Sequence, residues 1–148
     1  MLIHGIDVPG PWDDEIDQHR WVDEATGLDC AIVRGPLGAW CGYVGVDATH
    51  PEWGAPYQDV EADVHGGLTW SHGYLPGEQL DLVDGVWWFG FDCSHFNDLI
   101  PGMIAMAKLT EHRMPMAGDE SLPWSKETYR DVAYVTIEVC GLAEQLAS

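Results

Sequence analysis

A stretch in the middle of the chain holds side chains that could bind a metal ion or move protons. Asp63 and His65 stand two residues apart, so in an extended strand they would point to the same side. Glu61 falls on that side too and is a candidate acid–base catalyst. Gly66 and Gly67 follow directly, and glycine lets a backbone turn closely around a ligand. The stretch therefore predicts an ionisable strand face that ends in a turn.

A second stretch follows an aromatic run and carries groups of the same kinds. Asp92 ends the run, and His95 and Asp98 come shortly after it. Imidazole nitrogens and carboxylate oxygens are ligands that borderline divalent metals prefer. If the two stretches are neighbours in space, four side chains would converge on one divalent metal ion: Asp63, His65, Asp92 and His95. Asp98 would be the spare carboxylate, available for acid–base catalysis.

A bound metal would lower the pKa of a coordinated water and so supply a hydrolytic nucleophile. The pattern predicts a metal-dependent hydrolase of a small polar or phosphorylated metabolite. It is a loose pattern, so a structural role stays open, in which the aspartates cap turns and backbone carbonyls satisfy the histidines. Cys93 stands between Asp92 and His95 and suggests a thiol nucleophile, but a buried, unreactive thiol is the simpler interpretation.

The eight tryptophans are a third signal. Flat indole rings fill a core or stack on a planar ligand. Trp53 and Trp70 flank the acidic stretch near residues that break regular structure, so they are the candidates for a pocket wall. Gly66 and Gly67 would offer backbone N–H groups to a small-molecule ligand in that pocket.

The excess of acidic residues limits the kinds of partner that the protein can bind. Six Lys and Arg against 25 Asp and Glu give a formal net charge of −19. Such a surface repels phosphate backbones and anionic lipid headgroups, which excludes non-specific nucleic-acid binding and membrane binding. No apolar run is long enough to span a bilayer, and the first residues lack the pattern of a secretion signal. We therefore expect a cytoplasmic protein with reduced cysteines; the sequence predicts no oligomeric state.

Apolar spacing and capping residues predict three helices, over residues 13–26, 102–113 and 128–146. In the last, apolar residues recur at intervals of three and four, behind Thr128 and Asp131 as a capping-box pair. The first has acidic residues suited to an N-cap, and its Ile16 and Val22 would face the core.

Apolar runs and alternation predict four strands, over residues 30–33, 40–46, 60–65 and 86–91. The residues at 35–38 are turn formers, so the first two strands should form an antiparallel hairpin. Asp84-Gly85 marks a tight turn before the aromatic run. The segment 50–59, broken by Pro and Gly, predicts a surface loop.

These elements suit one domain over residues 1–148, because 148 residues with 46% hydrophobic side chains can bury a sizeable core. The expected fold class is α+β, with a mainly antiparallel sheet of four to five strands and helices on one face. The strands over 60–65 and 86–91 should lie close together, which would bring the two chemically active stretches into one site.

Several motifs extend the argument: GYVGV at 42–46, HP at 50–51, VHGGLT at 64–69, WWFGFDC at 87–93 with His95 and Asp98, and YRD at 129–131. Together they resemble a family of small uncharacterised proteins encoded by tailed bacteriophages and related bacterial genomes. The resemblance spans about residues 28 to 146 and implies a setting in the cytoplasm of an infected host cell, without implying a mechanism. Two non-catalytic interpretations stay open beside the hydrolase: a binding module that uses the same pocket to sequester a host nucleotide signal, and, because the chain is so acidic, a decoy for a host DNA-binding protein.

Overall fold

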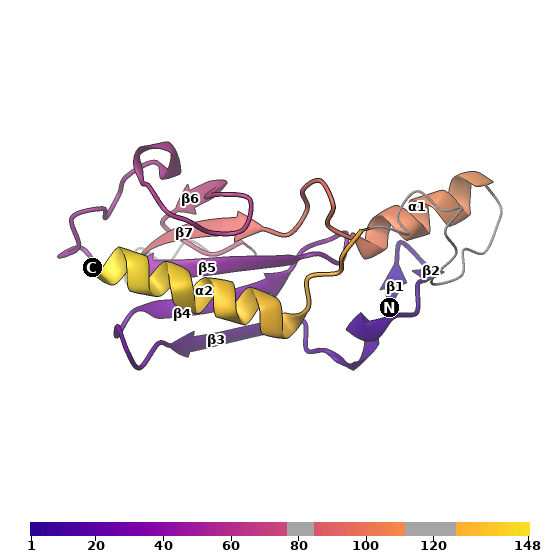
Figure 1. Cartoon of the computed structure of the whole chain (residues 1–148), viewed down its shortest axis with the longest axis horizontal. Helices are drawn as coiled ribbons and strands as arrows, with labels where there is room; N and C mark the ends of the chain where they lie inside the picture. Colours follow the sequence, from indigo (N-terminus) through magenta and orange to yellow (C-terminus); the bar gives the residue numbers. More distant parts are fainter. Residues whose placement is uncertain (77–84, 112–126) are drawn as a thin grey trace.

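The computed structural model describes residues 1–76, 85–111 and 127–148. Its centre is an antiparallel sheet of five strands in the order β3, β4, β5, β7, β6. Helix α2 (Val132–Ala147) packs across one face of this sheet, against β4 and β5 (Figure 1). The predicted α+β class and antiparallel sheet are confirmed. The strands are β3 (Gln18–Val22), β4 (Asp29–Arg34), β5 (Trp40–Val46), β6 (Trp70–His72) and β7 (Trp87–Asp92).

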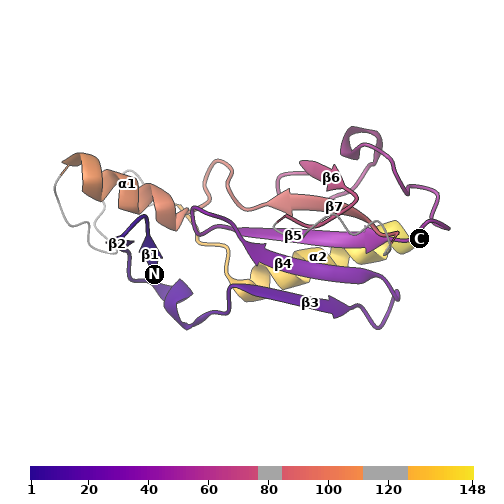
Figure 2. The same cartoon turned by 180° about the vertical axis from the view of Figure 1, so that it is seen from behind.

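A smaller group of elements lies beyond one end of the sheet. Helix α1 (Pro101–Glu111) stands there beside a two-stranded sheet of β1 (Leu2–Ile3) and β2 (Ile6–Asp7). Helix α1 corresponds to the helix predicted over 102–113, as far as the described residues reach. Figure 2 shows the far face of the main sheet, over which no described helix lies.

The predicted hairpin is confirmed as β4 and β5. The two strands pair in antiparallel register, with Ala31 opposite Tyr43. Strand β7 pairs with the other side of β5 and ends at Asp92, as predicted. Apolar side chains of these strands and of α2 bury one another. The largest of them are fully buried: Ile32, Trp40, Phe89, Phe91 and Leu142.

Helix α2 confirms the helix predicted near the end of the chain, although it starts only at Val132. Its N-cap is Asp131, whose side chain accepts a hydrogen bond of 2.8 Å from the N–H of Tyr134. The predicted capping box is wrong, because Thr128 lies before the helix and forms a backbone bridge with Asp98. The predicted apolar stripe is buried against the sheet: Val135, Val139, Leu142 and Leu146.

Residues 13–26 do not form the predicted helix. The middle of that range, residues 18–22, is strand β3, in which Trp21 lies opposite Cys30 of β4 and packs on the core. Ile16 and Val22, expected to face the core, are 54% and 58% exposed. Two apolar side chains are too few to anchor an amphipathic helix, whereas the edge of β4 offers a full row of backbone partners.

The predicted strand over 60–65 is also wrong, although its alternation is seen in the burial of Val60 and Val64 and the exposure of Asp63. The segment runs along α2 without joining the sheet. The side-chain amide of Gln145 exchanges hydrogen bonds of 2.7 and 2.8 Å with the backbone N–H and C=O of Asp63. Strand β6, which the sequence patterns do not predict, takes the place beside β7.

The remaining predictions concern loops and thiols. Residues 50–59 form the predicted loop, with turns and the short 3-10 helix Tyr57–Asp59. In the predicted turn Asp84-Gly85, Asp84 lies outside the described residues, and Gly85 has a φ of 59°. All four cysteines are free. Among the described helices, none combines the length and the apolar character needed to cross a membrane.

Candidate metal centre

The two chemically active stretches meet at Asp98, in the loop after β7. Its side chain is completely buried. The N–H of Leu99 donates to the C=O of Thr128, and the N–H of Thr128 donates to the C=O of Asn97, both at 2.8 Å. This bridge ties the loop to the segment that leads into α2. Side chains from the loop and from α2 are therefore held in a fixed relation to each other.

Three partners satisfy the carboxylate of Asp98. Nε2 of His65 lies 2.7 Å from Oδ2, which also accepts the backbone N–H of His95 at 3.0 Å. Nε of Arg130 donates to Oδ1 at 2.9 Å. Burial by itself disfavours the charged carboxylate, but the hydrogen bonds from His65, Arg130 and His95 outweigh it and hold the pKa of Asp98 below its ordinary value. Asp98 is therefore ionised at neutral pH.

His65 is held at both ring nitrogens. While Nε2 faces Asp98, Nδ1 lies 2.8 Å from the hydroxyl oxygen of Tyr134 on α2. The Tyr134 hydroxyl donates to Oε1 of Glu138, one helical turn further on, at 3.2 Å. The guanidinium of Arg130 lies 5.0 Å from the centre of the Tyr134 ring. These contacts fix the plane of the imidazole and the direction in which Nε2 points.

His95 lies against the turn at Gly66. Its ring meets that of His65 edge to face, with centroids 5.8 Å apart. A Cβ atom at Gly66 would lie 2.4 Å from the His95 ring, and Gly66 has a φ of +70°, so glycine fits this position on two grounds. Nδ1 of His95 is buried and has no hydrogen-bond partner among the described residues. Oδ1 of Asp92 lies 3.5 Å from it.

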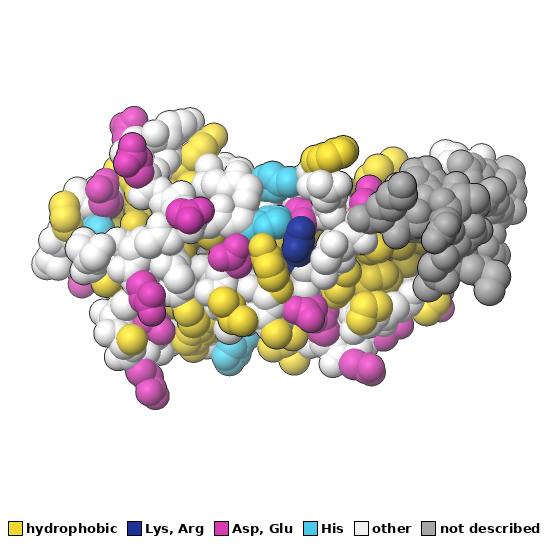
Figure 3. Space-filling view, in the orientation of Figure 1, with side chains coloured by type: hydrophobic (Ala, Val, Ile, Leu, Met, Phe, Trp, Pro, Cys, Tyr) yellow, Lys and Arg dark blue, Asp and Glu magenta, His cyan; other side chains and the backbone are white. Residues whose placement is uncertain are grey.

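His65, His95 and Asp98 form the candidate metal-binding cluster. One ligand atom from each of them lies within 4.8 Å of the other two. Figure 3 shows histidine side chains beside acidic side chains and a basic one near the middle of the face that carries α2. The His95 side chain is 31% exposed, so the cluster opens to solvent on that side.

The predicted ligand Asp92 lies beside the cluster and caps a turn. Its Oδ1 accepts the N–H of Ser94, and its Oδ2 accepts the hydroxyl of Thr69, both at 3.1 Å. Asp98, predicted as the spare carboxylate, occupies the central place instead. Asp92 thus positions the loop, while the buried Asp98 supplies the third ligand atom of the cluster.

The predicted ligand Asp63 and the predicted catalytic residue Glu61 are exposed and lie outside the cluster. Both line a shallow hollow with Gln145 of α2. The expected strand face is not formed, because residues 60–65 make no backbone hydrogen-bond ladder with another strand and the chain turns at Gly66. Alternation along the chain therefore does not bring these carboxylates to His65.

The residues of the predicted ligand pocket serve other contacts. The indole N–H of Trp53 donates to the C=O of Gly85 at 2.8 Å. Trp70 packs edge to face on Tyr43, in the apolar cluster on the sheet face opposite α2. The N–H of Gly67 donates to the C=O of Val64 at 2.8 Å and closes the turn. The contacts of both indoles thus lie away from the metal-binding cluster.

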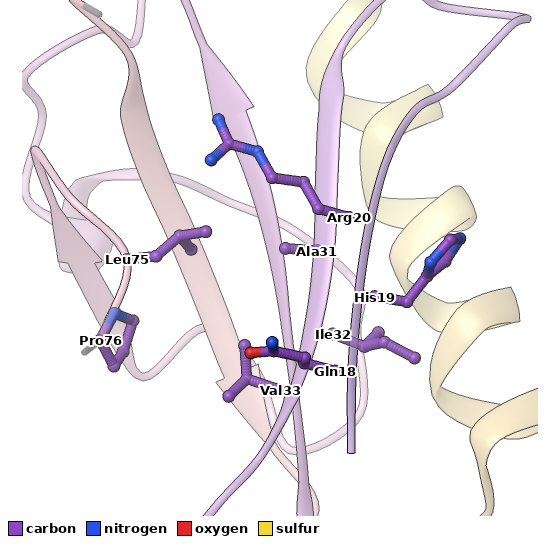
Figure 4. A pocket seen from close by; sticks show the side chains of 8 residues that line it. All are labelled: Gln18, His19, Arg20, Ala31, Ile32, Val33, Leu75 and Pro76. Carbon is purple, nitrogen blue, oxygen red and sulfur yellow. The ribbon is translucent and has the colours of Figure 1, made fainter. Parts of the chain in front are cut away.

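A hollow of about 450 Å³ lies on the far face of the sheet (Figure 4). Side chains from β3, from β4 and from the residues after β6 surround it, whereas His19 and Ile32 point toward α2. The guanidinium of Arg20 lies 5.0 Å from the centre of the Trp88 ring. None of the predicted site residues lines this hollow. It is therefore separate from the metal-binding cluster.

Two residues that matter to the site were not among the predicted ones. Arg130, just before α2, holds Asp98, and Tyr134, in the first turn of α2, holds His65. A signal exists for Tyr134, since Tyr134 and Glu138 are spaced by four residues and share one face of α2. That face lies beside the apolar stripe, and only the packing of α2 shows that it meets His65.

Cys93 is unsuited to nucleophilic chemistry. Burial raises the pKa of its thiol to about 12, and the neighbouring Asp98 adds to the effect. A thiol with such a pKa stays protonated at neutral pH, and the thiolate is the reactive form. Cys93 is also part of the apolar core, in line with the simpler of its two interpretations.

Known proteins add no constraint on the fold or the site. A scan against models of protein families finds no matching family, and searches of curated proteins and of solved structures find no match. The resemblance to bacteriophage proteins accordingly stays a prediction. Any functional conclusion rests on the site itself.

Proposed function

We propose that this protein binds one divalent metal ion through His65, His95 and Asp98 and uses it to hydrolyse a small polar or phosphorylated metabolite. The observation that carries the proposal is the convergence of three ligand atoms within 4.8 Å of one another. They come from segments 33 residues apart in the sequence.

The chemistry of the donor set fits such an ion. Two imidazoles and one carboxylate suit borderline metals such as Zn²⁺ and Mn²⁺. Three protein ligands leave room in the coordination sphere for water and substrate, as in catalytic rather than structural zinc sites. A coordinated water has a lowered pKa and becomes a nucleophile at neutral pH. Hydrolysis consumes one water and leaves the broken bond's electron pair on the departing group.

The surroundings of the cluster support the same proposal. Metal-ligating histidines usually use their second ring nitrogen in a hydrogen bond that fixes the ring, and Nδ1 of His65 has such a partner in Tyr134. The contact between Nε2 of His65 and Oδ2 of Asp98 requires a proton, which a metal ion would displace. Metal uptake should therefore release protons.

Calorimetric titration of Zn²⁺ and of Mn²⁺ into the metal-free protein tests the metal site. We expect uptake of one ion per chain. His65→Ala and His95→Ala should each weaken binding at least about 100-fold, because loss of an outer hydrogen-bond partner alone typically costs 10- to 100-fold. His19→Ala, an exposed histidine on β3, is the matched control and should bind like the wild type.

Hydrolysis is then tested with the metal-loaded protein and a generic phosphate monoester, 4-nitrophenyl phosphate. Turnover should require the metal and disappear in His95→Ala. Phe96→Ala changes the neighbouring residue, which is 93% exposed, and should stay folded and active. A wild-type protein that takes up no metal stoichiometrically contradicts the proposal. Metal uptake without turnover of any small ester would leave a metal-dependent binding protein instead.

A further inference from the structure

Arg130 is the cation of the candidate metal centre. Its Nε is engaged by Asp98, and its guanidinium stacks over Tyr134. Within the described part of the chain, its two terminal amino groups make no hydrogen bond. The side chain is 25% exposed. A guanidinium fixed in this way presents paired N–H donors without first having to be ordered.

The position of Arg130 stands out in so acidic a chain. There are six Lys and Arg residues in all, and two of them, Arg113 and Lys126, lie outside the described residues. Arg34 is buried against Glu15, and the ammonium of Lys108 donates to a backbone carbonyl of β2. Arg20 lies on the far face of the sheet. Among the described cations, Arg130 is thus the one at the metal centre.

We propose that Arg130 and the metal ion together bind the phosphoryl group of a phosphate monoester substrate. This inference rests on the proposed function, and it narrows the substrate class from polar metabolites to phosphorylated ones. Oδ1 of Asp98 faces Arg130 and Oδ2 faces His65. The guanidinium and the His65 imidazole therefore lie against the two oxygens of one carboxylate. A metal and a guanidinium so close together form the clamp that phosphoryl oxygens require.

The charges of the site predict under which condition phosphate binds. The −1 of Asp98 and the +1 of Arg130 cancel, and the chain as a whole is strongly acidic. A divalent ion would add two positive charges to the site, less the charge of the proton that it displaces between His65 and Asp98. Phosphate should therefore bind much more tightly to the metal-loaded protein than to the metal-free one.

The test measures metal and anion affinities separately, by calorimetry, in the full chain. Mn²⁺ is titrated first, and inorganic phosphate is then titrated into the Mn²⁺-loaded protein. In Arg130→Gln we expect Mn²⁺ affinity to change much less than phosphate affinity, because removing a positive charge beside the metal offsets the loss of the hydrogen bond to Asp98. Phosphate affinity should fall at least 10-fold. In Arg130→Lys, which keeps the charge without the fork of donors, phosphate affinity should fall less.

Arg20→Gln is the matched control, since it removes one positive charge from the other side of the sheet. It should leave both affinities unchanged. Thermal melts confirm that each variant is folded; if Arg130→Gln is not, Arg130→Lys still has to show weaker phosphate binding at unchanged Mn²⁺ affinity.

Five outcomes would overturn the inference. Wild-type affinity for phosphate in Arg130→Gln would show that the guanidinium does not bind the anion. Parallel loss of Mn²⁺ and phosphate affinity would show that Arg130 acts only through Asp98. Acetate binding as tight as phosphate would assign the site to carboxylates. Mn²⁺ uptake without phosphate binding would remove the phosphoryl subsite and leave the metal site standing, whereas absence of Mn²⁺ uptake would overturn the proposed function as well.

Discussion

Gly66 is the residue at which the candidate site can be perturbed without changing a ligand. The neighbouring Gly67 provides the comparison, because both have positive φ, +70° and +77°. Alanine in this region of backbone space costs roughly 1–2 kcal/mol at either position. Only at Gly66 would the added Cβ meet the His95 ring; nothing lies within 4 Å of it at Gly67.

We therefore predict that the two alanine variants differ in metal binding and much less in stability. Gly66→Ala should weaken Mn²⁺ or Zn²⁺ binding at least about 10-fold, the cost of a misplaced ligand. Gly67→Ala should bind like the wild type. Calorimetric titration and urea unfolding of both variants measure the two effects. Equal metal affinities would mean that the His95 ring is not a ligand.

At the residue scale, the sequence predicted part of the candidate site. The types and spacing of His65, His95 and Asp98 identified groups that the fold does bring together. The role of Asp98 was not predictable, because which of two nearby aspartates is buried depends on the backbone bridge to Thr128. Arg130 was not predicted either, since its partner lies 32 residues away in the chain.

At the scale of elements, the contact between α2 and the sheet depends on a glycine of β5. A Cβ at Gly42 would lie 2.5 Å from the Phe91 ring and 2.6 Å from Cγ2 of Val139 on α2. The absence of a side chain lets the helix settle on the strand at this point. Such overpacking of a dense core typically costs about 1–3 kcal/mol.

Two glycine-to-alanine substitutions should change the free energy of unfolding in opposite directions. Gly42→Ala should lower the free energy of unfolding by about 1–3 kcal/mol. Gly141→Ala, inside α2 with nothing within 4 Å of the new Cβ, should raise it by about 0.5–1 kcal/mol, because alanine favours the helix. Urea unfolding of the two variants measures both. A neutral Gly42→Ala would show that α2 packs less closely than described.

Elements with many apolar residues were predicted well, and those with few were not. The hairpin of β4 and β5, strand β7 and helix α2 carry their own dense apolar patterns. Residues 13–26 do not, and the open edge of β4 decides their conformation. The segment over 60–65 alternates like a strand, but a side chain of α2 satisfies its backbone. Such long-range partners are not visible in a local pattern.

At the scale of the whole molecule, a buried network around Glu15 joins the sheet to the start of α2. Glu15 accepts hydrogen bonds from Arg34 at 3.1 Å, from the N–H of Val132 at 2.7 Å and from the hydroxyl of Tyr129. Burial opposes its ionisation, but the hydrogen bonds from Tyr129, Val132 and Arg34 outweigh it and lower the pKa of Glu15 below its ordinary value of 4.5.

This lowered pKa predicts an acid-dependent contribution to stability. A carboxyl group whose pKa is lower in the folded than in the unfolded chain stabilises the fold fully above its unfolded pKa, and the contribution is lost as pH falls through the folded value. We expect Glu15→Gln to lower the free energy of unfolding by about 1–3 kcal/mol at pH 7. The difference from the wild type should shrink below about pH 4.5.

Urea unfolding of both proteins at several pH values from 7 to 3 measures that difference. Taking the difference removes the effect of the other carboxyl groups, whose protonation changes the repulsion within a chain of net charge −19. A difference that stays constant down to pH 3 would show that protonation of Glu15 does not cause the loss of stability in acid. Asp14→Asn changes a nearby exposed carboxylate; it is the matched control and should leave the free energy of unfolding at pH 7 nearly unchanged.

The placement of the metal-binding cluster has a consequence for folding kinetics. Strands β3, β4 and β5 form successive hairpins, whose closure spans short loops. The contacts of His65 span 33 residues to Asp98 and 69 residues to Tyr134. Loop-closure entropy delays such distant contacts relative to local ones. The cluster should thus be completed after the rate-limiting step, so a bound metal would slow unfolding and leave the rate of folding nearly unchanged.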